Sequence, residues 1–246
     1  MRVTIAQTDI AFGEKDKNLN NTKRITREAH PGIILFPELF TTGFDYDNLK
    51  ELSEEVPGET TDTLRRVCGD SIVGGSIVQR EKEIYNTFFL LDSDGILGTY
   101  RKIHLFREEK KRFTPGRDTV VLDTKFGRVG LATCYDIRFP ELFRELVKKG
   151  AEVVLVTAEF PKPRDEHWKV LLTARAIENQ VFVIAANRVG SDKRQGYFGR
   201  SMVIDPWGKT LLEGSSEEEI LSCDIDVSRV SKIRKDFPVL SDSKIL

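Results

Sequence analysis

Four short apolar runs, each bounded by glycine, proline or polar residues, place the strongest constraint on the fold of this chain. A continuous run of this length, without the alternation of a half-exposed strand, is typical of a β-strand buried on both faces. Such strands need helices over the faces of their sheet, so the runs favour the α/β class. The runs are 32–37 (GIILFP), 129–133 (VGLAT), 151–157 (AEVVLVT) and 181–187 (VFVIAAN).

Helical and hairpin patterns occupy the segments between these runs. The turn at 92–95 (DSDG) joins two further strand-like segments as a hairpin. Hairpins mixed with crossovers argue against a purely parallel sheet, so we expect two packed mixed sheets between helical layers. The predicted helices are 17–29, 60–69, 141–149 and 165–179, the last with an apolar stripe of Trp168, Leu171, Leu172 and Ile177.

Composition limits the domain organisation and the classes of partner. The 246 residues contain no linker or low-complexity run, so we expect one domain over 1–246, with 227–246 as a C-terminal tail. Because 38 Lys+Arg nearly balance 39 Asp+Glu, no general electrostatic argument favours nucleic acid or a membrane as partner. No signal peptide or membrane-spanning run is visible, which predicts a cytoplasmic location. The three cysteines lack metal-ligand spacing and form no disulfide pattern.

Two polar residues follow buried runs and are candidates for chemistry. Cys134 ends the run at 129–133 and precedes a helix start at Pro140, a setting that favours thiolate over thiol. Glu38 ends the run at 32–37. Since ligand sites in open α/β sheets lie at the carboxyl ends of strands, the two side chains could share a pocket. The alternatives are that Cys134 is a small core residue and that Glu38 is solvated.

The charged region between the hairpin and Cys134 has a plainer interpretation. A lysine in a strand exit such as Lys102 is usually exposed, and a lone histidine such as His104 is more often a hydrogen-bonded structural residue than a base. The charged cluster at 107–112 is typical of a solvated loop.

Six separated motifs, in order along nearly the whole chain, resemble the nitrilase superfamily of carbon-nitrogen hydrolases. That resemblance implies an α-β-β-α sandwich and a Glu-Lys-Cys triad. It further implies that no metal or organic cofactor is needed. The motifs are PELF around Glu38, YRKIHLF around Lys102, EKKRFTPG from Glu109, CYDIRFPEL from Cys134, HWKVLLTARAIENQ from His167 and SMVIDPWG from Ser201.

The resemblance also implies roles for individual residues. Glu38 would be the general base, Cys134 the nucleophile and Lys102 the cation that stabilises the tetrahedral oxyanion. Glu109 matches a second glutamate that orients substrate and catalytic groups. The backbone N–H of Tyr135 would be the second donor to the oxyanion.

Within the superfamily the chain is most similar to omega-amidases, which hydrolyse the terminal amide of 2-oxoglutaramate and related dicarboxylate monoamides. The segments 160–168 (FPKPRDEHW) and 187–192 (NRVGSD) carry this similarity. A carboxylated substrate needs a cation, for which Arg138 is our first candidate. The alternative for Arg138 is an ion pair with Asp136 or Glu141. The further candidates for substrate binding are Tyr135, Phe160, Arg164 and Arg188.

Other functions remain open from the sequence. The same triad could act on a nitrile, an N-carbamoyl amine or a neutral aliphatic amide, and a scaffold or redox-sensing role for Cys134 is an alternative of another class. By resemblance we expect a homodimer or larger assembly formed through the helices at 139–149 and 167–179, although their apolar stripes could equally belong to the core.

Overall fold

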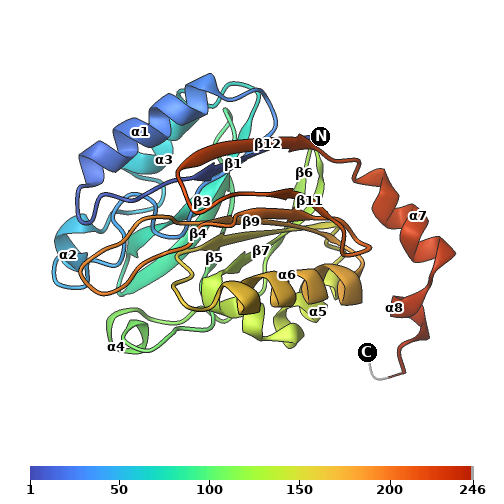
Figure 1. Cartoon of the computed structure of the whole chain (residues 1–246). Helices are drawn as coiled ribbons and strands as arrows, with labels where there is room; N and C mark the ends of the chain where they lie inside the picture. The colour runs from blue at the N-terminus through green and yellow to red at the C-terminus, as the bar shows by residue number, and fades with distance from the viewer. Residues whose placement is uncertain (245–246) are drawn as a thin grey trace.

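The computed structural model describes residues 1–244 and consists of two six-stranded mixed sheets packed face to face (Figure 1). In the first sheet the two ends of the chain meet, because β12 pairs antiparallel with β1. β1, β2 and β3 are parallel, and β4 and β5 follow as hairpins. Its order is β12 (Glu219–Asp224), β1 (Arg2–Gln7), β2 (Ile33–Leu35), β3 (Ile72–Arg80), β4 (Ile84–Leu91) and β5 (Ile96–Arg101).

The second sheet repeats this arrangement. Three parallel strands, β7, β8 and β9, form its centre, and antiparallel strands flank them on both sides. The carboxyl ends of β7 and β8 therefore lie at the same edge of the sheet. Its order is β11 (Thr210–Glu213), β10 (Met202–Ile204), β9 (Phe182–Asn187), β8 (Val153–Ala158), β7 (Gly127–Thr133) and β6 (Val121–Thr124).

Helices cover the outer face of each sheet, which completes an α-β-β-α sandwich (Figure 1). The helices α1 (Lys15–Glu28) and α3 (Glu59–Arg65) cover the first sheet, whereas α5 (Pro140–Lys148) and α6 (Asp165–Asn179) cover the second. The remaining helices are α2 (Leu49–Leu52), α4 (Glu109–Arg112), the 3₁₀ helix η1 (Cys134–Arg138), α7 (Ser228–Asp236) and α8 (Val239–Asp242).

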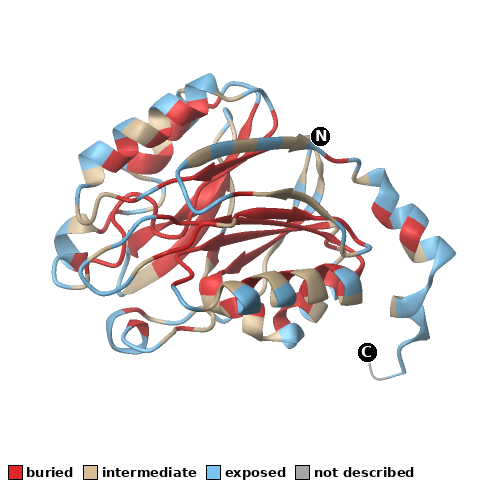
Figure 2. Ribbon diagram, in the orientation of Figure 1, coloured by how far each residue is buried: buried red, intermediate tan, exposed pale blue. Residues whose placement is uncertain are grey.

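Alternating side chains of each strand build two different layers of core. Val3 and Ile5 face the second sheet and join its strands in one large cluster. Ile34 faces the other way and packs in a separate cluster with Ile25 of α1 and Leu64 of α3. Figure 2 shows that buried residues follow the strands and the inner sides of these helices. Each fully buried side chain of this size contributes roughly 1.5–3 kcal/mol, so both layers hold the strand ends in place.

The prediction of an α/β fold with two mixed sheets between helical layers is confirmed. The helix predicted at 60–69 ends at Arg65. Strand β6 was not predicted, because its apolar run is only three residues long (120–122) and its side chains are largely half-buried. In the α6 stripe Trp168 and Leu172 are buried as expected, but Ile177 is 48% exposed. The predicted stripe was therefore wrong at Ile177.

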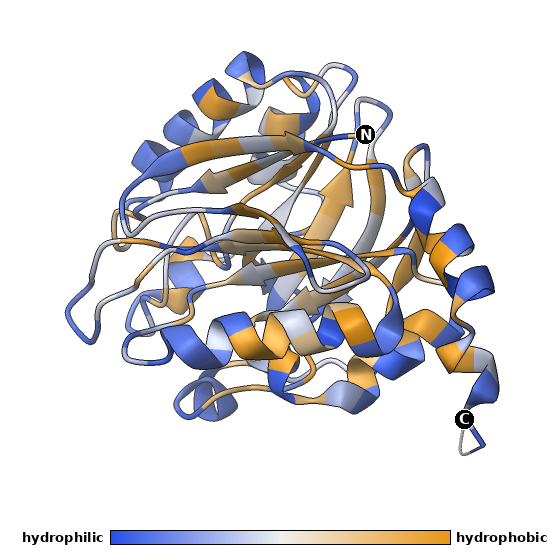
Figure 3. Cartoon of the chain, turned by 45° about the vertical axis from the view of Figure 1, so that its right-hand side comes forward, coloured by the Kyte–Doolittle hydropathy of each residue, from blue (hydrophilic) through white to orange (hydrophobic). Residues whose placement is uncertain are grey.

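The segment predicted as a tail begins with helix α7, which packs on the protein. Val230 and Ile233 are buried, and the guanidinium of Arg234 donates to the carbonyl of Ala151 at 2.8 Å. Figure 3 shows hydrophobic residues along the strands and hydrophilic residues alternating with them along the helices. Among residues 1–244, no helix has the length and apolar character required to cross a bilayer.

Candidate active site

Cys134 stands where β7 ends and η1 begins, in a backbone conformation that few residues adopt. Its φ angle is +47°, in the left-handed region that is unfavourable for residues with a β-carbon. Strain of this kind persists where the surroundings hold it, most often at functional sites. Cys134 as a whole is 8% exposed, so the turn places the residue almost entirely inside the protein.

Glu38 and Lys102 meet inside the protein although they come from different strands. Glu38 follows β2, and the next residue, Leu39, also has a left-handed φ of +44°. Lys102 directly follows β5, and its Nζ lies 2.7 Å from Oε1 of Glu38. Both side chains have no exposed surface. Local features alone predicted an exposed Lys102, whereas the structure buries it and pairs it with Glu38.

Glu109 completes this ion cluster from α4. Its Oε1 lies 2.7 Å from Nζ of Lys102, and its Oε2 accepts a hydrogen bond from the backbone N–H of Phe106 at 2.7 Å. The segment 107–112 was predicted from its charges to be a solvated loop. That prediction was wrong at Glu109, which is 3% exposed and turns inward from a single helical turn.

Two further groups hold the carboxylate of Glu38. The side-chain amide of Asn86, on β4, donates to Oε1 at 2.7 Å. The backbone N–H of Glu159, just after β8, donates to Oε2 at 3.0 Å. Neither contact was predicted. Asn86 sits in the strand segment YNTFFL, where a buried amide among apolar residues was the available signal.

The electrostatics of the cluster keep Cys134 protonated at rest. Burial, followed by the negative charge of Glu38, raises the pKa of the Cys134 thiol well above its usual range, and Lys102 only partly opposes this. This direction is opposite to the prediction that the setting favours the thiolate, because burial and the charge of Glu38 both favour the thiol. The charges of Glu38, Lys102 and Glu109 all act on this pKa. Thr133 of β7 is paired with Thr157 of β8, so Cys134 lies beside the end of β8, where the backbone N–H of Glu159 contacts Glu38. A base must remove the thiol proton during attack.

Burial acts in opposite directions on the pKa values of Lys102 and Glu109. Burial lowers the pKa of Lys102, but the charges of Glu109 and Glu38 outweigh burial and raise it well above its usual value. Burial and the charge of Glu38 raise the pKa of Glu109 to about 7, although Lys102 opposes them. The cluster therefore retains a permanent cation next to carboxylates that share it.

Asp136 links the segment that carries Cys134 to the segment that carries Lys102. Its Oδ2 accepts from the hydroxyl of Tyr100 at 2.7 Å and from the backbone N–H of Thr133 at 2.8 Å. Its Oδ1 accepts from the backbone N–H of His104 at 3.1 Å and lies 2.7 Å from Nδ1 of the same residue. His104 is thus a structural residue, as the sequence predicted.

A small pocket opens beside Cys134 and gathers most of the predicted substrate-binding residues. The guanidinium of Arg138 lies 5.4 Å from the ring centre of Phe160, and its Nη2 is 3.3 Å from Nδ1 of His167. Within residues 1–244, Arg138 forms no ion pair, so the pairing with Asp136 or Glu141 is not found. The pocket is lined by Phe106, Cys134, Tyr135, Arg138, Phe160, Pro161 and Arg164.

Arg188 lies outside this pocket. Its side chain has no exposed surface, and its Nη1 lies 2.7 Å from Oε2 of Glu159. A guanidinium enclosed in this way cannot meet a substrate carboxylate. We therefore correct the prediction that Arg188 binds substrate: the sequence could not show that a buried acid would take up its charge.

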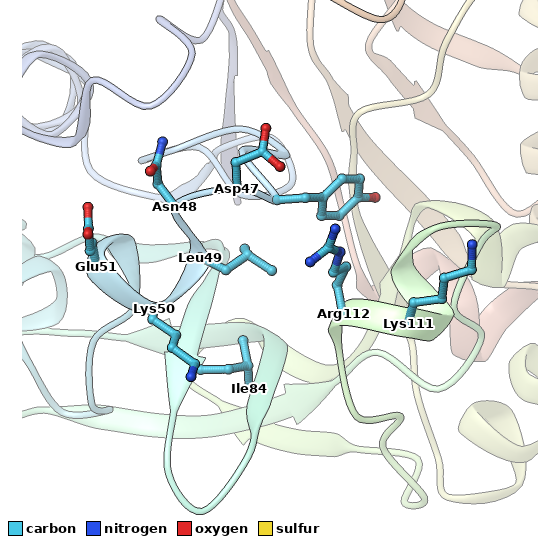
Figure 4. A pocket seen from close by; sticks show the side chains of 9 residues that line it. Asp47, Asn48, Leu49, Lys50, Glu51, Ile84, Lys111 and Arg112 are labelled. Carbon is cyan, nitrogen blue, oxygen red and sulfur yellow. The ribbon is translucent and has the colours of Figure 1, made fainter.

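A second pocket lies outside the reactive cluster, between α2 and α4 (Figure 4). Tyr46 at its edge packs against Phe113, with ring centres 6.3 Å apart. Burial and the charge of Glu109 raise the pKa of Tyr46. This pocket therefore borders the helix of Glu109 from outside. Its lining is Tyr46, Asp47, Asn48, Leu49, Lys50, Glu51, Ile84, Lys111 and Arg112.

Metal coordination has no visible basis in the part of the chain that the structure describes. Residues 1–244 contain no cluster of three or more His, Cys, Asp or Glu side chains that could hold a metal ion. All three cysteines are free.

Comparison with known proteins places this arrangement in a family. The family model described as carbon-nitrogen hydrolase matches residues 2–235. The chain belongs to the carbon-nitrogen hydrolase family. Its hydrolase fold has a TM-score of 0.91 with a CN-hydrolase superfamily protein of Xanthomonas campestris, at 28% identity, covering 100% of this chain and 98% of that one. The solved structure of that relative carries an arsenic adduct in the active site.

Two relatives with named activities extend the comparison. The 2-oxoglutaramate amidase of Bacillus subtilis is 39% identical over 249 residues, covering 98% of this chain and 96% of its own. An omega-amidase of Mus musculus is 33% identical over 262 residues, covering 99% and 95% of the two chains. The predicted membership of the nitrilase superfamily is thereby confirmed, and this carbon-nitrogen hydrolase is an enzyme.

Proposed function

We propose that this enzyme is an omega-amidase that hydrolyses the terminal amide of a small dicarboxylate monoamide such as 2-oxoglutaramate. The observation that carries the proposal is the buried cluster in which Glu38 and Glu109 both contact Nζ of Lys102 and act on the thiol of Cys134. The activities named for the relatives from Bacillus subtilis and Mus musculus support the choice of substrate.

The first half-reaction forms a thioester and releases ammonia. Glu38 takes the proton of the Cys134 thiol as the sulfur bonds to the amide carbon, which matches a thiol whose pKa burial has raised. Negative charge then develops on the carbonyl oxygen, where the ammonium of Lys102 and the backbone N–H of Tyr135 stabilise it. Glu38 returns the proton to the nitrogen, the carbon–nitrogen bond breaks, and ammonia leaves.

The second half-reaction restores the enzyme. Glu38 removes a proton from water as the water oxygen bonds to the thioester carbon. The tetrahedral oxyanion meets the same donors as before. The carbon–sulfur bond then breaks, Cys134 takes the proton back from Glu38, and the dicarboxylate product leaves. Glu109 holds Lys102 in place throughout through its 2.7 Å contact.

The far carboxylate of the substrate is assigned to the pocket arginines. Arg138 and Arg164 line the pocket beside Cys134, and Phe160 and Tyr135 supply apolar walls. A planar guanidinium can donate two parallel hydrogen bonds to a carboxylate. Since Arg138 is without a carboxylate partner among residues 1–244, it is the first candidate for this contact.

We also propose that the chain acts as a single hydrolase domain and forms a homodimer or larger assembly through α5 and α6. Val170 and Ile177 of α6 are 62% and 48% exposed, and exposed apolar side chains on one helix face are typical of an interface. The mass in solution tests this: a monomer at micromolar concentration contradicts it.

The experiment that tests the activity is a panel that follows ammonia release from 2-oxoglutaramate, asparagine, N-carbamoylputrescine and a simple nitrile. The wild-type enzyme is compared with Cys134→Ala. The proposal predicts strong preference for 2-oxoglutaramate and loss of turnover in the variant. Preference for a neutral member of the panel contradicts the omega-amidase assignment, while leaving the hydrolase mechanism intact.

A further inference from the structure

Arg188 and Glu159 form an ion pair in the interior that the mechanism above does not use. Nη1 of Arg188 lies 2.7 Å from Oε2 of Glu159, and both side chains have no exposed surface. Replacing such a pair by apolar residues is often neutral or stabilising, so burial alone does not account for it. Moreover, Oε1 of Glu159 has no hydrogen-bond partner, which is a further free-energy cost.

The guanidinium of Arg188 ties together segments that are distant in sequence. Its Nη2 donates to the carbonyl of Ile10, beyond the end of β1, at 2.8 Å. Asp9 and Asp192 lie 3.3 and 3.4 Å from its nitrogens, and its charge lies 4.4 Å from the ring centre of Tyr197. Arg188 therefore fixes the chain after β1 and the loop after β9 relative to Glu159.

The other side of Glu159 contacts the general base. The backbone N–H of Glu159 donates to Oε2 of Glu38 at 3.0 Å. Next to it, the hydroxyl of Thr157 donates to the carbonyl of Phe36 at 3.0 Å, which holds the segment leading to Glu38. A single residue thus has its side chain in the ion pair and its backbone on the catalytic carboxylate.

We propose that Glu159 and Arg188 are positioning residues: their buried pair fixes the backbone N–H of Glu159 against Oε2 of Glu38 and thereby sets the orientation of the general base. The proposal rests on the assignment of Glu38 as base in the proposed function. It also assigns Arg188 a role in place of the substrate binding first predicted. Burial raises the pKa of Glu159 to about 7 although Arg188 opposes this, so burial disfavours the ionised carboxylate that the pair requires.

The charges around Glu159 come from several elements. Arg188 favours its ionised form, whereas Glu38 opposes it, and Tyr197 is close enough to influence it. Asp9 and Asp192 compete for the same guanidinium. A neutral Glu159 would hold Arg188 less strongly than these two carboxylates do, but its carbonyl oxygen could still accept a hydrogen bond from the guanidinium and keep the position of Glu159.

The test compares Arg188→Met with Arg229→Met as a matched control. Arg229 likewise pairs with a buried carboxylate, that of Asp205, at 3.1 Å, and it lies outside the catalytic cluster. The proposal predicts that Arg188→Met lowers kcat about 10- to 100-fold while KM changes less than about threefold. The control should retain wild-type kcat. A folded Arg188→Met enzyme with wild-type kcat and only a lower Tm overturns the proposal.

Two more variants test the proposal if Arg188→Met does not fold. Glu159→Leu/Arg188→Met leaves neither charge of the pair buried alone, and the proposal predicts the same loss of kcat in it. Glu159→Gln keeps an oxygen that can accept from Arg188, so kcat should stay within about threefold of wild type. Wild-type kcat in the double variant, or a loss in Glu159→Gln as large as in the double variant, contradicts the proposal.

A readout without substrate separates this inference from the proposed function. The rate at which iodoacetamide alkylates Cys134, located by peptide mass, reports how well Glu38 removes the thiol proton. The pH profile of this rate should shift to higher pH in Arg188→Met and remain unchanged in Arg229→Met. If no amide is hydrolysed but this shift is found, the positioning role stands and only the substrate assignment fails; an unshifted profile overturns the positioning role.

Discussion

Lys102 and Glu38 form an ion pair in which Nζ and Oε1 lie 2.7 Å apart and neither side chain reaches solvent. The same Nζ atom lies 2.7 Å from Oε1 of Glu109, so one buried ammonium serves two carboxylates. A buried site tolerates an excess of negative charge poorly. The raised pKa of Glu109, about 7, is the consequence, since a proton on Glu109 leaves one cation paired with one anion.

Removing the positive charge of Lys102 should lower stability and kcat more than removing the carboxylate of either Glu38 or Glu109. Lys102→Met leaves Glu38 and Glu109 buried without a positive partner, which should lower the free energy of unfolding by about 3–5 kcal/mol. It also removes the charge that stabilises the oxyanion, so kcat should fall at least about 100- to 1000-fold. Urea unfolding and steady-state turnover measure the two effects. Wild-type stability would mean that the cluster is not held by this charge.

Glu109 should make stability depend on pH. Its folded pKa, about 7, lies above its ordinary value of 4.5, so the folded state binds the extra proton between these values. The stabilisation from this group is fully present below about pH 4.5 and is lost as pH rises through about 7. Glu109→Gln should therefore reduce the fall in unfolding free energy between about pH 5 and pH 8 by on the order of 2–3 kcal/mol.

Urea unfolding at several pH values measures this effect, with Glu108→Gln as the control. Glu108 is exposed and pairs with Lys111 on the surface, so its removal should leave the pH dependence unchanged. An equal pH dependence in wild type and Glu109→Gln would show that Glu109 does not hold a proton near neutral pH.

Asp136 should be needed for the alignment of nucleophile and cation. Asp136→Asn removes the charge that accepts hydrogen bonds from Tyr100, Thr133 and His104. Hydrogen bonds to a charged group contribute about 1.5–3 kcal/mol each, so Tm and kcat should both fall clearly. Tyr100→Phe removes only one donor, and its loss of about 1 kcal/mol in unfolding free energy should be smaller. Thermal unfolding and turnover compare the two; equal effects contradict the assigned role of Asp136.

Arg138 should decide between carboxylated and neutral amides. Arg138→Lys keeps the charge but cannot donate two parallel hydrogen bonds, so KM for 2-oxoglutaramate should rise about tenfold. Hydrolysis of a neutral amide should change little. Steady-state kinetics on both substrates measure the ratio. An equal rise in KM for the two substrates would mean that Arg138 shapes the pocket and does not bind the substrate carboxylate.

The buried strands and the positions of Glu38 and Cys134 could be predicted because continuous apolar runs indicate burial on both faces and end at the ligand-binding edge. The inward turn of Glu109 could not be predicted from composition. A charged run such as 107–112 is usually solvated, and only the packing of α4 on Lys102 reverses this for one residue. The role proposed for Glu109 came from the family resemblance.

Two of the site predictions that needed correction, those for Cys134 and Arg188, share one cause. The local sequence around Cys134 indicates a turn after a strand, but the desolvation that raises its pKa depends on the whole surrounding sandwich. Likewise, Arg188 follows a buried strand, and its pairing with Glu159 depends on the neighbouring strand, 29 residues away in sequence. Burial and partners of charged groups are properties of the assembled fold.

The most direct test of the account is the mass of the enzyme after rapid acid quenching during turnover of 2-oxoglutaramate. The account predicts a covalent adduct whose mass equals the acyl part of the substrate, located on the peptide that contains Cys134 and absent from Cys134→Ala. Turnover with no adduct on this peptide, or an unchanged rate in Cys134→Ala, would contradict a thioester at Cys134.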